Sequence, residues 1–179
     1  MPINISWLAL SLVRGIGRKT LNNLLETFAT TDDILCADRK ALMQVQGIGN
    51  KTAQAIIDIK LHDLVLDAEK WQEAGVEIIP HYADNYPESL KSLDDAPLVL
   101  FTRGNYQPET WHNAVAIIGT RQPSKEAKKI AFDLAHNLAQ SGRPVISGLA
   151  LGIDSAGHHG ALQADTAPTI AVLGGGVLN

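Results

Sequence analysis

The chain carries one arginine among small residues that are suited to hold a phosphate group. Arg121 closes the stretch Gly119-Thr120-Arg121, and two more small-residue stretches follow, Ser147-Gly148-Leu149 and Gly174-Gly175-Gly176. A guanidinium binds a phosphate through two parallel hydrogen bonds. These stretches match neither the G-x-G-x-x-G pattern of dinucleotide sites nor the G-x-x-x-x-G-K-[ST] pattern of P-loops. We therefore expect a phosphate cradle that uses no cofactor.

Alternating strands and helices must position these three loops. Runs of β-forming residues at 115–118, 143–147 and 167–176 each lead into one loop, and helical spacing of apolar residues covers 124–142, with Ser124 as the cap. This order predicts a parallel sheet with right-handed crossovers, and the carboxyl ends of such strands gather their loops at one edge. The predicted fold class is α/β, a Rossmann-like parallel sheet with helices on both faces.

An eight-residue phrase occurs twice near the N-terminus, as VRGIGRKT at 13–20 and as VQGIGNKT at 45–52. Apolar residues at helical spacing flank both copies, so each copy predicts a helix, a Gly-Ile-Gly hairpin and a second helix. We expect the first glycine to be left-handed, the isoleucine to enter the core, and the second glycine to open a helix that faces a phosphate. The residues of these two hairpin sites are Gly15, Gly17 and Lys19 in the first copy and Gly47, Gly49 and Lys51 in the second.

The hairpin pattern resembles the helix-hairpin-helix element, which grips a nucleic-acid backbone without reading bases. A purely structural role for the glycines remains the alternative. We favour backbone binding by the first copy, because the second has Gln46 and Asn50 where the first has Arg14 and Arg18.

Charge is distributed unevenly along the chain, although the net charge is only −4. Residues 1–61 hold seven Lys/Arg against five Asp/Glu, residues 62–111 three against ten, and residues 112–179 five against four. A polyanion would therefore meet the two ends of the chain rather than its middle. We predict a small all-α, SAM-like tandem hairpin domain at 1–61, a connector and N-terminal extension at 62–111, and an incomplete Rossmann-like domain at 112–179.

Composition argues against export and membrane insertion. No apolar run approaches the roughly 18 residues of a membrane-spanning helix, and the N-terminus lacks a secretory signal. The single cysteine, Cys36, fits a reducing compartment. We expect a cytoplasmic protein that has no membrane contact.

Three segments, AIIGTRQPS, VISGLALGIDSAGHHGAL and TIAVLGGG, closely resemble in order and spacing the DNA-processing protein A family, also called DprA or Smf. The segments YPESL and APLVLFTRGN extend the resemblance upstream, and many members also carry the tandem hairpin domain. The resemblance implies a non-enzymatic protein that binds single-stranded DNA, hands it to the RecA recombinase during natural transformation, and forms homodimers. Carried onto this chain, Arg121 is the phosphate-binding arginine, and Ser147, Gly148 and Gly174 line its pocket.

The chain departs from the family pattern in two ways. Leu151 and His159 stand where many members have arginine, so fewer counterions would be released on binding and the salt dependence would be flatter. The family also continues beyond the third strand, which indicates a fragment or a truncated product.

Two other functions remain alternatives. One is a phosphoribohydrolase-like Rossmann enzyme, although the G-G-G-x-G-T-x-x-E signature of that group is missing from GGGVLN. The other is a hairpin module that holds duplex or junction DNA while the α/β unit serves as scaffold.

Several single residues have competing interpretations. Asp154 is either a helix cap or a group that orients Arg121 or Ser147, and Ser147 is a hydrogen-bond donor rather than a nucleophile. His158 and His159 lack a third ligand, so we expect neither a metal site nor a catalytic residue. The remaining cations form either a solvated surface or an extension of the DNA track: Lys125, Lys128, Lys129 and Arg143.

Overall fold

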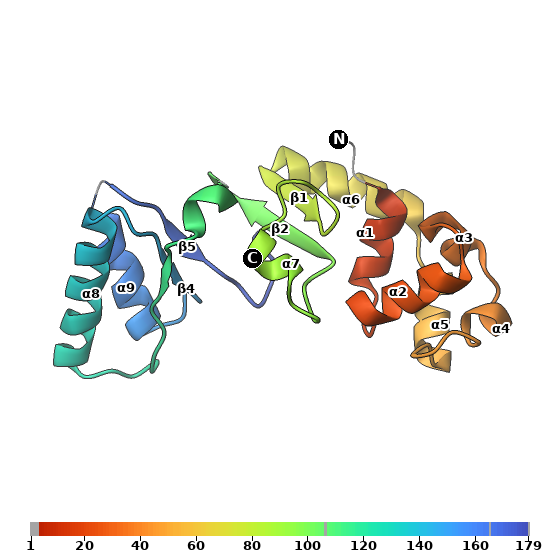
Figure 1. Cartoon of the computed structure of the whole chain (residues 1–179), viewed down its shortest axis with the longest axis horizontal. Coiled ribbons are helices and arrows are strands. Elements are labelled where there is room, and N and C mark those ends of the chain that lie inside the picture. Colours follow the sequence, from red (N-terminus) through yellow and green to blue (C-terminus); the bar gives the residue numbers. More distant parts are fainter. Residues whose placement is uncertain (1–3, 106, 165, 179) are drawn as a thin grey trace. The chain divides into compact units, whose positions relative to one another are not determined.

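A computed structural model of the chain describes residues 4–105, 107–164 and 166–178. The chain divides into two compact units, residues 1–106 and residues 107–179 (Figure 1). None of the helices in the described ranges has the length and apolar character needed to cross a membrane.

The first unit is mainly helical. In chain order its elements are α1 (Ile5–Leu12), α2 (Arg18–Thr27), α3 (Thr31–Cys36), α4 (Arg39–Leu42), α5 (Asn50–Ile57), α6 (Leu61–Glu73), β1 (Val76–Pro80), α7 (Glu88–Lys91) and β2 (Val99–Arg103). The hairpin helices before and after each Gly-Ile-Gly are therefore present, as the repeat predicts. Helix α3 was not predicted, yet its capping box is readable in the sequence, because Thr30 and Asp33 bond each other's backbone N–H.

The two hairpins have the same backbone conformation. Gly15 has φ +95° and Gly47 has φ +93°, which confirms the predicted left-handed turns. The isoleucines that follow them, Ile16 and Ile48, are each 6% exposed and pack in one core.

The two copies also pack against each other in a reciprocal way. A β-carbon placed on Gly15 would lie 3.6 Å from Oγ1 of Thr52, and one placed on Gly47 would lie 3.5 Å from Oγ1 of Thr20. Each copy thus supplies the threonine that the other copy's glycine contacts, and the repeat forms one folded body.

A second apolar cluster joins the hairpin helices to the residues that follow them. Leu8 of α1 packs with Ala68 of α6, Ile78 of β1 and Val99 of β2. Strands β1 and β2 pair antiparallel, with Val76 opposite Arg103 and Pro80 opposite Val99. Packing is therefore continuous across residue 61. The predicted domain boundaries at 61 and 111 stay a prediction.

The second unit is the α/β part of the chain. In chain order its elements are a 3-10 turn (Pro108–Trp111), β3 (Val115–Ala116), α8 (Lys125–Gln140), β4 (Val145–Ser147), α9 (Ile153–Leu162) and β5 (Thr169–Ala171). The strands are parallel in the order β3-β4-β5. The predicted Rossmann-like parallel sheet is confirmed, and so is Ser124 as the cap of α8, because its hydroxyl accepts the N–H of Ala127.

Helices α8 and α9 share one face of this sheet, so the described residues place helices on one of the two faces that the sequence predicted to be covered. Each crossover advances by one strand in the same direction, and crossovers of the same hand then place their helices on the same side. The two helices lie side by side (Figure 1) and approach closely. A β-carbon on Gly160 of α9 would overlap the Phe132 carbonyl oxygen of α8, so only glycine fits there.

Candidate nucleic-acid interface

The carboxyl ends of β3 and β4 bring two of the predicted loops together. The backbone N–H of Ile153 donates to the carbonyl oxygen of Thr120 at 3.2 Å, which joins the loop after β4 to the loop after β3. The third strand contributes Val172, whose N–H donates to the carbonyl oxygen of Ser147 at 2.9 Å. Gly174 and Gly175 of the third loop are exposed and stand in open space, since no atom would lie within 4 Å of a β-carbon on either.

Asp154 holds the first two loops. Its Oδ1 accepts the backbone N–H of Gly119 at 3.3 Å, and its Oδ2 accepts the N–H of Gly148 at 3.1 Å. The side chain is 6% exposed. The sequence offered two roles for this residue, a helix cap or a group that orients Arg121 or Ser147. In the structure Asp154 joins two loops and makes no cap, and the Ser147 side chain is among the groups that stabilise its carboxylate.

The carboxyl of Asp154 is stabilised as a carboxylate. Burial alone raises the pKa of Asp154, but hydrogen bonds from the backbone N–H groups of Gly119, Ala150 and Gly148 outweigh burial, and the pKa lies below its ordinary value. Because the N–H groups of Gly119 and Gly148 are already bonded, they do not point at an approaching anion. An anion at this edge would therefore be met by side-chain cations rather than by these two amides.

Ser147 also has a structural partner. It is 2% exposed, and its hydroxyl donates to the carbonyl oxygen of Ile117 at 2.6 Å, a bond between neighbouring strands. The predicted role of Ser147 as a donor to a bound ligand would require this bond to break.

Gly152 sets the position of the Thr120-Arg121 backbone. Its φ is +95°, and a β-carbon there would overlap the Thr120 carbonyl oxygen and lie 2.8 Å from the Arg121 Cα. The loop after β3 therefore rests directly on the backbone at the start of α9. No side chain other than hydrogen fits between them.

The side chain of Arg121 is exposed. Within the described residues its guanidinium takes part in no ion pair and no hydrogen bond. Lys125 and Thr120 are also exposed. Leu149 is 54% exposed and has φ +58°, a conformation that costs a non-glycine residue about 1–3 kcal/mol and often marks functional loops.

The positions of the two departures from the family pattern are both on the surface. Leu151 is 77% exposed, and His159 is exposed on α9. His158, its neighbour, is instead 5% exposed and bonds Oγ1 of Thr169 through Nδ1 at 2.7 Å. The adjacent histidines therefore face different surroundings.

The hairpin glycines of the first unit are exposed, as are Lys19 and Lys51. Gly17 and Gly49 open α2 and α5, and neither helix start has a side-chain cap. The two hairpins differ in one respect: the Arg18 Nη1 donates to the carbonyl oxygens of Lys91 (2.7 Å) and Leu93 (2.9 Å). Arg18, one of the two arginines that favoured the first copy as a backbone binder, is thus held by the end of α7 and the loop that follows it.

Sequence reasoning missed this role of Arg18. No local pattern links residue 18 to residues 91–93, so only the fold reveals it. The bond between Asp154 and Gly148 spans only six residues, so the short run from Gly148 to Asp154 was the available sequence signal for it.

Comparisons with known proteins agree with these observations. Residues 77–179 match the family model "DNA recombination-mediator protein A", and residues 8–59 match a SAM-like tandem helix-hairpin-helix model. Protein Smf of Synechocystis sp. is 30% identical over 175 residues, which cover 96% of this chain and 44% of that protein. DNA processing protein DprA of Bacillus subtilis is 35% identical over 106 residues, or 59% of this chain and 35% of that protein.

The fold agrees as well. The X-ray structure of DNA processing protein A from Streptococcus pneumoniae superposes with a TM-score of 0.71 at 26% identity, and the match covers 100% of this chain and 60% of that one. The chain spans less than half the length of these two curated relatives.

Proposed function

This chain belongs to the DNA recombination-mediator protein A family, and from that membership we propose that it binds single-stranded DNA through Arg121. The observation that carries the proposal is that Arg121 has an exposed guanidinium while the backbone of its loop is held in place by the residues packed against it. Asp154 and Gly152 hold the backbone of the loop, while the Arg121 side chain is exposed and unpaired among the described residues.

Arg121 would act as a fork that binds one phosphodiester through two hydrogen bonds. Because Asp154 is buried and its oxygens accept N–H groups, its charge does not face the strand. Contacts to phosphates carry no sequence information, so we expect little base preference. The strand would lie along the exposed residues at this sheet edge, including Thr120, Leu149, Gly174 and Gly175.

The remaining parts of the proposal come from the family alone. The bound strand would be delivered to the RecA recombinase in natural transformation, in the cytoplasm and without a chemical step, by a full-length protein that forms a homodimer.

The test is oligo-dT binding by fluorescence anisotropy across a salt series. Arg121→Ala should weaken binding and flatten the plot of log K against log salt by about 0.7, the value for one neutralised phosphate on a single strand. Arg39→Ala removes the same charge from an exposed position on α4 and is the matched control. Equal effects of the two substitutions would remove Arg121 from the site.

A second candidate function is backbone binding by the second hairpin. It is favoured by one observation: Gly49 opens α5 without a side-chain cap, beside the exposed Lys51, and no arginine there is engaged by a loop. Lys51→Ala should then weaken binding of duplex DNA more than Lys40→Ala on α4 does. Equal binding by the two variants would leave the hairpins as scaffold.

A further inference from the structure

An open hollow lies between the N-terminal halves of α8 and α9. Its volume is about 480 Å³, and it is lined by Lys128, Lys129, Phe132, Gly152, Ser155, Ala156 and His159. Its rim has one aromatic ring and three side chains that can carry positive charge, of which Lys128 reaches across it, and no carboxylate lines it. Resting on the proposed function, we propose that this hollow binds a second phosphodiester of the same single strand and stacks a base against Phe132.

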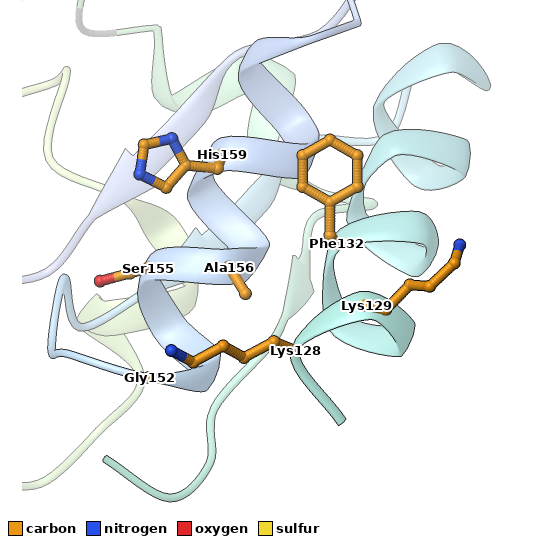
Figure 2. A pocket seen from close by; sticks show the side chains of 7 residues that line it. All are labelled: Lys128, Lys129, Phe132, Gly152, Ser155, Ala156 and His159. Carbon is orange, nitrogen blue, oxygen red and sulfur yellow. The ribbon is translucent and has the colours of Figure 1, made fainter. Parts of the chain in front are cut away.

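Lys128 is the central cation of the hollow. Figure 2 shows its side chain reaching from α8 across to Gly152 at the start of α9, whereas Lys129 and His159 point away to either side. Lys129 is paired with Asp133 at 2.6 Å, but Lys128 forms no ion pair within the described part of the chain. The ammonium of Lys128 is thus available to a ligand.

The start of α9 adds to the positive character of the hollow. The N-terminus of a helix carries partial positive charge, and α9 starts at Gly152 without a side-chain cap. An anion between this helix end and the ammonium of Lys128 would be attracted by both, and a phosphodiester has the required charge.

The ring of Phe132 supplies a surface for a base. Phe132 is half-buried between the two helices and lines the hollow beside the cations. Stacking on an aromatic ring tolerates every base, as expected of a site that lacks sequence preference.

Gly152 connects the hollow to the proposed Arg121 site. Its backbone lines the hollow, and the same residue lies directly against Thr120 and Arg121. A strand bound by the guanidinium of Arg121 could therefore continue over Gly152 into the hollow without leaving the protein surface.

Substitution of the two neighbouring lysines tests the hollow. We expect Lys128→Ala in the full chain to weaken oligo-dT binding several-fold and to flatten the salt dependence by about 0.7, as for one phosphate. Lys129→Ala removes the same charge from the next residue of the same helix, but from a side chain that points away, and should have the smaller effect. Equal effects of the two substitutions would overturn the assignment.

Two further experiments test the stacking contact of Phe132 and whether the hollow prefers a DNA strand to free phosphate. Phe132→Leu keeps an apolar side chain and should weaken binding at every salt concentration alike, with thermal unfolding used to verify folding. Unchanged affinity in a folded Phe132→Leu protein would overturn the stacking contact. Inorganic phosphate or dTMP that shields Lys128 from acetylation as well as oligo-dT does would make the hollow a free-phosphate site instead.

The results that would overturn the assignment of the hollow differ from those that would overturn the proposed function. If wild-type protein binds oligo-dT and Arg121→Ala weakens it, but Lys128→Ala matches Lys129→Ala, only the hollow is excluded. If wild-type protein binds no oligo-dT, both proposals are overturned.

Discussion

The N–H of Gly119 donates to the carboxylate of Asp154 at 3.3 Å, a bond that ties the loop after β3 to the first turn of α9 across 35 residues of chain. The other oxygen of the same carboxylate accepts the N–H of Gly148. One buried side chain therefore sets the distance between two loops that the proposed function needs.

Asp154→Asn should destabilise the second unit and weaken DNA binding. Asparagine has one acceptor oxygen, so its amide group would face one of the two backbone N–H donors, and an unpaired buried amide costs about 1–3 kcal/mol. Urea unfolding and hydrogen exchange at the amides of Gly119 and Gly148 measure this cost. Glu109→Gln, at an exposed position of the same unit, is the control and should change stability little.

Gly152→Ala should displace Arg121, whereas Gly142→Ala should not. Both glycines have positive φ, +95° and +77°, so both substitutions strain the backbone, and the strain is larger at 152, where ψ is −121° and lies outside the left-handed helical region. Only a β-carbon at 152 would also strike the Thr120 carbonyl and the Arg121 backbone, because nothing lies within 4 Å at 142. Oligo-dT affinity should fall for Gly152→Ala alone. A similar loss in both variants would mean that Gly152 has no specific effect on the loop.

Arg18→Ala should destabilise the first unit by about 2 kcal/mol, since it removes two charge-assisted hydrogen bonds to the carbonyls of Lys91 and Leu93. Arg14→Ala, in the same hairpin but exposed, should stay within about 0.5 kcal/mol of wild type. Chemical denaturation, followed by the fluorescence of Trp7 and Trp71, measures both. A stable Arg18→Ala protein with weakened DNA binding would instead assign Arg18 to the nucleic acid.

Stability should fall as the pH drops below about 6.5, the ordinary pKa of histidine. Burial lowers the pKa of His158, and nearby His159 adds to this effect, while the charge of Asp154 partly opposes it. The unfolded chain then takes up a proton that the native chain resists, so the free energy of unfolding decreases as the pH falls toward the lowered pKa.

Thermal unfolding between pH 8 and pH 5 measures this dependence. His158→Asn should reduce the slope, and His112→Asn, at an exposed position, should leave it unchanged. A slope that survives His158→Asn in full would assign the effect to other groups. Of these, His81 is a candidate because burial and the charges of Arg18 and Lys91 lower its pKa.

Local patterns were enough to predict the three parallel strands, helix α8 and the helices of both hairpins, but not α3. The position of α8 follows from its apolar spacing and from Ser124, whose hydroxyl caps it as predicted. The left-handed glycines 15 and 47 follow from the repeat itself, because each ends one helix and precedes another.

Long-range relationships were beyond these patterns. Whether α8 and α9 share a face depends on strand order, which no local window contains. The partner of Arg18 lies more than 70 residues away in the sequence. In the predicted phosphate cradle, the backbone N–H groups of Gly119 and Gly148 donate to Asp154 and are not free for a ligand. The hollow beside Lys128 needed the close approach of two helices, which Gly160 permits.

The reciprocal contact of Gly15 with Thr52 and of Gly47 with Thr20 has a consequence for dissecting this chain. Each copy of the phrase packs against a side chain of the other copy. A peptide that holds one copy alone would lack this contact, so we expect the two hairpins to fold only as a pair.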